Sequence, residues 1–358
     1  MSKQKQKRIV PQIQAYDAGT MQMVGGDVAS RLMANGMNPM ALRPWTHDGK
    51  TYINVNGVAT PIAYASTLRK DEWKLLDEAI IGVSRQRLTF VDDLMNAGLT
   101  FPLANPLGTT VLETENISDM EAAQVSMDAR TRGDEDRPQY DIEYLPIPIV
   151  FKDFSISIRV LEASRKLGRT LDVTMAETAA RKVNDTIETM ALVGTSGPTF
   201  GGGTVYGILN KSGINSGSMG TNWDASAATG ATVLTDVLNM IITAHAAKHY
   251  GPYNIYIPTA YGVALEDDFK ANGDQTIKER LERISSVGRV RTADYMTTAN
   301  VAMVQMTSDV VRIVTGMAPT TVQWDTDGGM TLNFKVMAIM VPQVRNDQDG
   351  SSGIVKYT

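Results

Sequence analysis

Two histidines could together bind a metal ion. His245 and His249 are four residues apart in a segment with helical periodicity, a spacing that places both on one helix face and suits metal coordination. No glutamate follows His245, however, so the zinc-protease pattern is missing, and no third ligand is suggested nearby. His47 could in principle belong to a Ser/His/Asp triad, but no motif around it supports this role. We therefore interpret the histidine pair as part of an ordinary helix face.

Other patterns that could support catalysis are incomplete. Gly194-Thr195-Ser196-Gly197 lacks the spacing of a nucleophile elbow. Gly201-Gly202-Gly203-Thr204 lacks the lysine of a phosphate loop and does not lead directly into a helix, which favours a flexible surface loop. Carboxylates are numerous, but no pair stands apart as a glycosidase site requires. A triad assembled in space stays open, yet we predict no catalytic residue, no metal and no cofactor, and hence no enzyme.

The composition indicates a protein with a substantial core and a charge content somewhat below the usual. Of the 358 residues, 43% are hydrophobic and 20% are charged, and the charged share lies below the usual quarter. Such a deficit fits a chain that hides much of its surface in neighbours. Cysteine is absent, which excludes disulfides, thiolate nucleophiles and cysteine-ligated metals. We predict no secretory signal and no membrane span, because no apolar run reaches about 18 residues.

The N-terminal tip differs in charge from the rest of the chain. The net charge of −5 argues against nucleic-acid binding by the chain as a whole. The tip is basic and carries Lys3, Lys5, Lys7 and Arg8. It is either a solvated, disordered terminus or an arm that contacts packaged nucleic acid or an acidic neighbour.

Hydrophobic periodicity predicts several helices. Apolar residues at spacings of three and four predict helices over 67–88 and 171–193. In the second, Thr174 with Glu177 fits a capping box, Asp172 is an equally good cap, and Gly194 ends the helix. Shorter helices are predicted over 233–249 (with Leu234, Leu238, Ile241 and Ala244 on the apolar face), 261–269 and 276–284.

Strand patterns are interspersed with these helices, which favours an α+β fold. Alternation predicts strands over 145–160 and 253–257. We expect 301–306 to pair with 310–314, and 320–324 to form a hairpin with 330–340 around Asp327-Gly328-Gly329. Residues 1–66 are largely irregular, apart from a possible short hairpin over 50–60.

Residues 108–144 form the most unusual stretch because acidic side chains dominate it. Partial alternation before Gly133-Asp134-Glu135-Asp136, which indicates a turn, predicts a long two-stranded hairpin. A lone hairpin is marginal in water, so we expect a partner surface to support it; a floppy acidic loop is the alternative. The charged residues expected at this contact are Glu113, Glu115, Asp119, Arg130, Arg132, Asp134, Glu135 and Arg137.

The order of elements resembles the Hong Kong 97 (HK97)-type fold of tailed-bacteriophage major capsid proteins and encapsulin shell proteins. Five segments carry the resemblance: Leu68–Asp77 (the amphipathic helix that opens encapsulin shells), Leu145–Ser157 (a strand entering the peripheral domain), Leu171–Gly194 (the long spine helix), Tyr206–Asn210 (a G-[IL]-x-N element) and Gly251–Pro258 with Tyr261 (the axial-domain strand and helix).

The resemblance implies a domain layout. Residues 1–66 would form an N-terminal arm, 67–104 the N-terminal helix and its connection, and 105–145 the extended loop. Residues 146–200 with 320–358 would form the peripheral domain around the spine helix, and 201–319 the axial domain. Residues 105–145 contain no lysine, so we expect no lysine-mediated cross-link of the kind that some members form.

The resemblance also implies a function. The chain would be a major capsid protein that assembles with itself, as hexamers and pentamers, into an icosahedral head around double-stranded DNA. Scaffold, portal or decoration proteins would be further partners, the host cytoplasm the place of assembly and the virion the final location. An encapsulin shell enclosing a cargo enzyme is the alternative, although some 66 residues before the first helix suit a phage arm better. A soluble hydrolase is a third hypothesis, which would need a convergent polar pocket.

Overall fold

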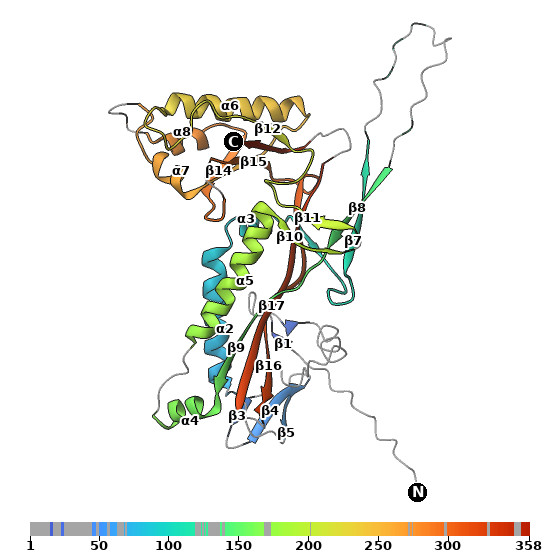
Figure 1. The fold of residues 1–358 in the computed structure, drawn as a ribbon, viewed down its shortest axis with the longest axis vertical. Helices are drawn as coiled ribbons and strands as arrows, with labels where there is room; N and C mark the ends of the chain where they lie inside the picture. The colour runs from blue at the N-terminus through green and yellow to red at the C-terminus, as the bar shows by residue number, and fades with distance from the viewer. Residues whose placement is uncertain are drawn as a thin grey trace.

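The computed structural model contains a helix-covered body, a long central sheet with helices beside it, a small three-stranded sheet near the end of the central sheet, and a projecting hairpin (Figure 1). It describes residues 15–16, 23–24, 45–47, 50–55, 58–62, 68, 70–118, 123, 125, 127, 137, 140–167, 173–200, 202–270, 273, 275–296, 299–327, 330–346 and 352–358.

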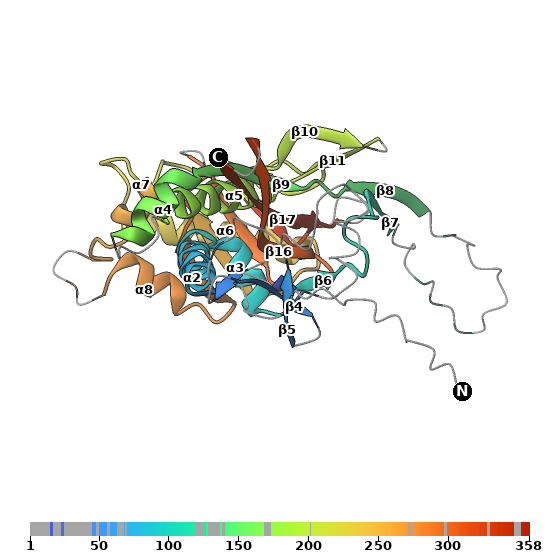
Figure 2. The ribbon, with the colours of Figure 1, turned by 90° about the horizontal axis from the view of Figure 1, so that it is seen from below.

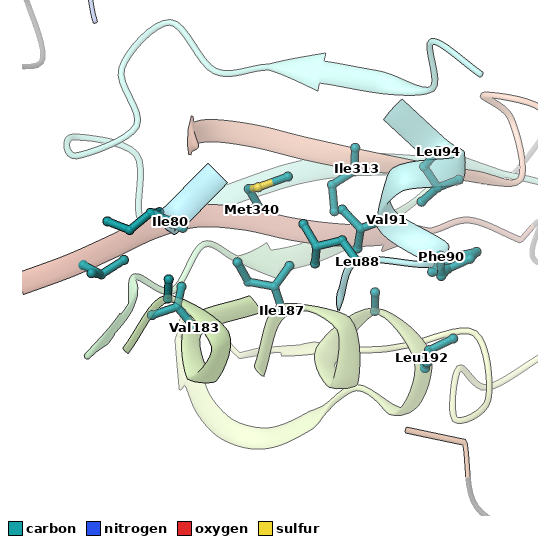
Figure 3. Packing of buried hydrophobic residues seen from close by; sticks show 14 of the residues in the cluster. Ile80, Leu88, Phe90, Val91, Leu94, Val183, Ile187, Leu192, Ile313 and Met340 are labelled. Carbon is teal, nitrogen blue, oxygen red and sulfur yellow. The ribbon is translucent and has the colours of Figure 1, made fainter. Parts of the chain in front are cut away.

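Helix α5 (Thr174–Val193) runs along the centre of the molecule beside α2 (Lys70–Arg87) (Figure 1). Its buried residues recur at spacings of three and four, so one stripe faces the core. Figure 3 shows Val183 and Ile187 of α5 in the same apolar layer as Ile80 of α2 and Met340. Both helices were predicted, and this shared layer explains why their periodicity was visible in the sequence.

The start of α5 differs from the prediction. The N-cap residue is Val173, which makes no side-chain cap hydrogen bond, so the predicted capping box of Thr174 and Glu177 is wrong. Asp172 lies outside the described residues. At the other end, the prediction is confirmed: Gly194 has a φ of 78° and its N–H donates to the carbonyl oxygen of Met190.

The central sheet has the strand order β6-β16-β17-β9. Its strands are β6 (Thr100–Pro102), β16 (Val311–Thr326), β17 (Thr331–Val344) and β9 (Val150–Ser157). The predicted β16–β17 hairpin is confirmed, in a register from Thr326 opposite Thr331 to Val311 opposite Val344. The sheet supports α5 along one face through the largest apolar cluster of the molecule.

The body above this sheet is built on a second sheet of order β12-β18-β15-β13-β14. Helix α6 (Gly230–Ala246) packs against it together with α7 (Thr259–Ala264) and α8 (Ile277–Glu282). The predicted strand over 253–257 and the predicted helix near 276–284 are confirmed. The strands are β12 (Asn215–Gly217), β18 (Ile354–Tyr357), β15 (Val301–Gln305), β13 (Tyr253–Ile257) and β14 (Val287–Thr292).

Two strand assignments differ from the sequence analysis. β15 pairs with β13 and β18, not with the strand that begins at Val311, so the predicted pairing of 301–306 with 310–314 is wrong. β18 lies inside the five-stranded sheet, whereas 320–358 were expected together in the other part of the fold. Both runs are short and almost entirely buried, so their sequences carry little register information.

Helix α6 also departs from expectation. It begins at Gly230 and ends at Ala246, and its N-terminus is a capping box between Thr229 and Thr232. His249 therefore lies beyond the helix, after Lys248 with a φ of 62°. The premise that His245 and His249 share a helix face is wrong.

The stretch predicted as one strand over 145–160 is divided. β8 (Tyr140–Pro146) ends before β9, and Ile158 opens a helix, α4 (Ile158–Lys166). Arg165 of α4 pairs with Glu72 of α2, with an Nη2–Oε2 distance of 2.7 Å, and this partner holds the helix in place. The sequence analysis also missed α3 (Phe90–Asn96), a single short helix between two longer elements.

The N-terminal region contains more regular structure than expected. β4 (Lys50–Val55) and β5 (Val58–Ile62) form the predicted hairpin, with Val55 opposite Val58, and β3 (Trp45–His47) extends it to three strands. A further pair joins β1 (Ala15–Tyr16) to β2 (Met23–Val24).

Candidate inter-subunit surfaces

The β7–β8 hairpin leaves the molecule on the side away from helices α2 and α4 (Figure 2). β7 (Val111–Ile117) and β8 (Tyr140–Pro146) pair antiparallel from Val111 opposite Pro146 to Ile117 opposite Tyr140. They form a two-stranded sheet by themselves. The base of the predicted hairpin is thereby confirmed.

One face of this hairpin is exposed and largely apolar. Tyr140, Ile142 and Tyr144 alternate along β8, with exposed fractions of 62%, 50% and 37%, so their side chains share a face. Ile117, 49% exposed, lies opposite Tyr140. Large apolar side chains gathered on a two-stranded ribbon indicate a surface that a partner covers.

The predicted residues Glu113 and Glu115 lie on the same face, opposite Tyr144 and Ile142 respectively, and both are exposed. Arg137 is also exposed. The remaining predicted contact residues, Asp119, Arg130, Arg132, Asp134 and Glu135, lie outside the described residues, as do Lys3, Lys5, Lys7 and Arg8. The described part of the hairpin thus combines an apolar strip with two carboxylates.

The opposite face anchors the hairpin to the subunit. Glu143 forms an ion pair with Lys211, whose side chain is 5% exposed. Gln343 of β17 donates from Nε2 to the hydroxyl oxygen of Thr114 over 2.6 Å. Leu145 is buried in an apolar cluster with residues of β16 and β17. These contacts fix the direction of the hairpin from its base.

A second, smaller hairpin contacts β8. β10 (Thr195–Phe200) pairs with β11 (Gly203–Val205), and β11 packs beside β8. Gly203 begins β11 and is buried, so this residue is not part of the expected surface loop. Gly201 lies outside the described residues.

The segment Tyr206–Asn210 closes the C-terminal end of α5. The backbone N–H groups of Ile208 and Leu209 donate to the carbonyl oxygens of Ala191 and Leu192, over 3.1 and 3.0 Å. The side-chain oxygen of Asn210 accepts from the N–H of Gly207 over 2.7 Å. The segment thus satisfies carbonyls that a helix end leaves unpaired, which gives the G-[IL]-x-N element a structural role.

Replacing Gly207 with alanine is expected to destabilise this junction. A Cβ atom at Gly207 would lie 2.4 Å from the backbone nitrogen of Gly194 and 2.6 Å from the carbonyl oxygen of Leu192. Backbone cannot move aside cheaply, so we expect a loss of roughly 1–3 kcal/mol in the free energy of unfolding. Urea denaturation of the subunit measures it. Gly220→Ala is the matched control, because nothing lies within 4 Å of its Cβ position.

A buried polar cluster joins the helical part to the five-stranded body. The hydroxyl of Tyr256 in β13 donates to Asp93 of α3 over 3.0 Å, and Arg291 of β14 lies 3.4 Å from the same carboxylate. Tyr256 also packs edge-on against Phe90, with ring centroids 4.9 Å apart. Burial raises the pKa of Asp93, although Arg291 and the Tyr256 hydroxyl oppose the shift. This cluster ties α3 to β13 and β14.

The carboxylate of Glu188 in α5 caps the N-terminus of α3. It accepts from the backbone N–H groups of Phe90 and Val91, over 2.6 and 3.3 Å, and the residue is 1% exposed. Burial raises the pKa of Glu188 to about 7, more than the backbone hydrogen bonds lower it. Sequence analysis missed both carboxylates: Glu188 reads as one more charge on an amphipathic helix, and Asp93 lies in α3, which was not predicted.

The described residues show neither a metal-binding cluster nor a membrane-spanning helix. Within the described residues, His, Asp and Glu side chains form no group of three that could hold a metal ion. None of the helices in the described part of the chain combines the length and hydrophobicity needed to cross a bilayer.

A family model described as "Family of unknown function (DUF6260)" matches residues 62–357. The chain belongs to this family. The match begins just before α2 and includes β18. The DUF6260 chain is also 31% identical over 119 residues to the type 1 encapsulin shell protein EncA of Myxococcus xanthus. This stretch covers 32% of the chain but only 37% of that relative's length.

Solved structures show the fold of the DUF6260 chain. The virus-like particle from Pyrococcus furiosus has a TM-score of 0.58 at 18% identity and covers 80% of this chain and 99% of its own. The capsid of Myoviridae phage XM1 has a TM-score of 0.56 at 13% identity, covering 76% and 91%. A capsid of a native GTA particle has a TM-score of 0.54 at 14% identity, covering 75% and 90%. The DUF6260 chain has the HK97-type capsid fold, as its sequence predicted.

Proposed function

We propose that this chain is the major capsid protein of a tailed bacteriophage. Copies of it would form hexamers and pentamers that close into an icosahedral head around double-stranded DNA. The observation that carries the proposal is the β7–β8 hairpin, which is anchored at its base and exposes Tyr140, Ile142 and Ile117 along one face. A neighbouring copy would bury this strip. The closed symmetry of a shell repeats the same contact for every subunit.

The charged residues of the sequence would have defined roles in such a shell. Glu113, Glu115 and Arg137 would set the register of the hairpin on its neighbour more than the affinity. The basic tip would face the interior and contact packaged DNA without sequence preference. Scaffold, portal or decoration proteins would be further partners. The chain would assemble in the bacterial cytoplasm, act in the virion and catalyse no reaction.

An encapsulin shell is the second candidate. The partial match to EncA favours it. The region before α2, with the β3-β4-β5 sheet, favours the phage reading, because encapsulin shells tend to begin near that helix. In an encapsulin, the inner surface would bind a terminal peptide of a cargo enzyme.

Electron microscopy of the purified, overexpressed chain tests the proposal. Uniform shells or capsomer rings are expected. A monodisperse monomer across a range of salt concentrations would contradict both candidates. The neighbouring genes separate the two candidates. Genes for portal and terminase proteins would indicate a phage head. A neighbouring gene whose product is a cargo enzyme that co-purifies with the shell on co-expression would indicate a nanocompartment.

A further inference from the structure

Two arginine side chains lie side by side on one face of the β16–β17 ribbon. Arg312 of β16 is opposite Gln343 of β17, and Arg345 follows Gln343 by two residues, so these side chains share a face. The N–H of Arg345 donates to the carbonyl oxygen of Val310 over 2.8 Å, which continues the pairing beyond β17. Such diagonal neighbours have their Cβ atoms about 7 Å apart.

The surroundings of Arg312 hold its guanidinium in place but supply no negative charge. Its Cζ lies 4.4 Å from the ring centroid of Phe101, and its Nε donates to Oε1 of Gln343 over 2.6 Å. Burial lowers the pKa of Arg312, and the charge of Arg345 lowers it further. Both arginines are half-buried, and neither forms an ion pair within the described residues. An anion from outside would stabilise these two like charges.

The nearby carboxylates of the same subunit are engaged or turned away. Glu143 lines the same small hollow as Gln343 and already forms the ion pair at the base of the hairpin. Thr114 accepts a hydrogen bond from Gln343 over 2.6 Å, and side chains alternate along a strand. Glu113 and Glu115 therefore point to the opposite side of β7, away from the arginines of their own subunit.

The exposed face of the β7–β8 hairpin carries a matching pair of anions. Glu113 and Glu115 are exposed, and two residues along a strand span about 7 Å. Neither glutamate forms an ion pair within the described part of the chain. The two carboxylates are thus spaced like the two guanidinium groups. Guanidinium and carboxylate also form one of the strongest side-chain hydrogen-bond pairs.

We propose that Arg312 and Arg345 of one copy bind Glu113 and Glu115 of a second copy. The inference rests on the proposed shell function and deepens it, because it names the surface on which the hairpin of a neighbour lies. The contact joins two different surfaces, so its repetition links copies head-to-tail around a closed ring.

A double-mutant cycle on assembly tests this contact. Light scattering measures the lowest concentration at which nuclease-treated protein forms particles. Arg345→Gln, and a hairpin variant with both Glu113→Gln and Glu115→Gln, should each raise this concentration about fivefold, the size expected for a half-exposed ion pair. The variant with all three changes should match the hairpin variant, because the same contact is already lost. Multiplying losses would overturn the pairing.

Arg159→Gln is the matched control, because it removes an exposed arginine from α4. It should assemble as wild type does, and an equal loss would show that net charge controls assembly and overturn the site. Normal assembly of Arg345→Gln would overturn the site and leave the shell function standing. If that variant assembled normally but retained less DNA, the site would bind phosphate and the carboxylate assignment would be wrong. Failure of wild type to assemble would remove the shell function itself.

Carbodiimide coupling gives an independent measurement, because it joins amines to carboxylates and does not couple arginine. In particles of the Arg345→Lys variant, the introduced amine should form an amide with Glu113 or Glu115. Particles mixed from isotope-labelled and unlabelled subunits should yield cross-linked peptides that contain both isotopes. Cross-links within one isotope only, such as links to Asp347 or Asp349 just after position 345, would place the carboxylate in the same chain and overturn the inference.

Discussion

A variant that lacks residues 124–137 is expected to fold as a subunit but to form no shells. The deletion leaves the seven pairs between Val111–Ile117 and Tyr140–Pro146 intact, together with the Glu143–Lys211 ion pair that anchors them. The subunit core lies in other elements, so its urea midpoint should change little. What is lost is most of the segment that joins β7 to β8, which under the proposed function lies on a neighbour. Electron microscopy and light scattering measure the loss of particles.

Point variants at the base of the hairpin separate assembly from folding. Ile142→Ser removes an exposed apolar side chain and should weaken assembly while the unfolding free energy stays near that of wild type. Leu145→Ser alters the buried face and should lower the unfolding free energy by about 2–5 kcal/mol. Unfolding of the deletion variant would show that the ribbon belongs to the subunit core. Normal shells from Ile142→Ser would show that its face is not a contact.

A pH-dependent loss of stability is expected from Glu188. Its pKa of about 7 in the folded subunit lies above the ordinary value of 4.5, so folding takes up a proton between these two values. The stabilisation from this proton is complete below pH 4.5 and is lost as the pH rises through 7. The full change is about 3 kcal/mol. Glu188→Gln removes the titration while it retains an oxygen that can accept from Phe90 and Val91.

Urea denaturation of the two proteins from pH 5 to pH 8 isolates this effect. The stability of wild type relative to Glu188→Gln should fall across the range, and the other carboxylates cancel in the difference. The groups that face Glu188 are the α3 N-terminus and Asp93, with Tyr256, Arg289 and Arg291 behind Asp93. Asp93→Asn is the control: it should lower the Glu188 pKa slightly and keep the slope. A pH-independent difference would contradict the prediction.

The elements predicted well are those in which the spacing of the apolar residues along the sequence matches the period of the helix or strand that they form. α5 and α2 each bury one stripe against a large core, and β16–β17 are two long strands joined by a turn. The first three residues of α4 were read as the end of a strand, because Ile156 and Ile158 continue the alternation of β9. α3 was missed because it has only seven residues.

The candidate contact surface was found from the sequence only in part. The acidic stretch and its hairpin were visible because they are local. The apolar strip of Tyr140, Ile142 and Tyr144 was not recognised, since alternation alone does not tell which face lies on the subunit. The pairing of Asp93 with Tyr256 joins residues 163 positions apart, and the sequence contains no signal for such a distant pairing.

The placement of β18 has a consequence for synthesis. Ile354–Tyr357 lie between β12 and β15, and residues 311–346, which form the other sheet, come before them in the chain. When the ribosome has made residues 215–305, the sheet of that body still has a gap in its middle. The gap closes only after both strands of the β16–β17 hairpin have been translated. A nascent chain therefore cannot present the finished body to its neighbours, which delays association until the subunit is nearly complete.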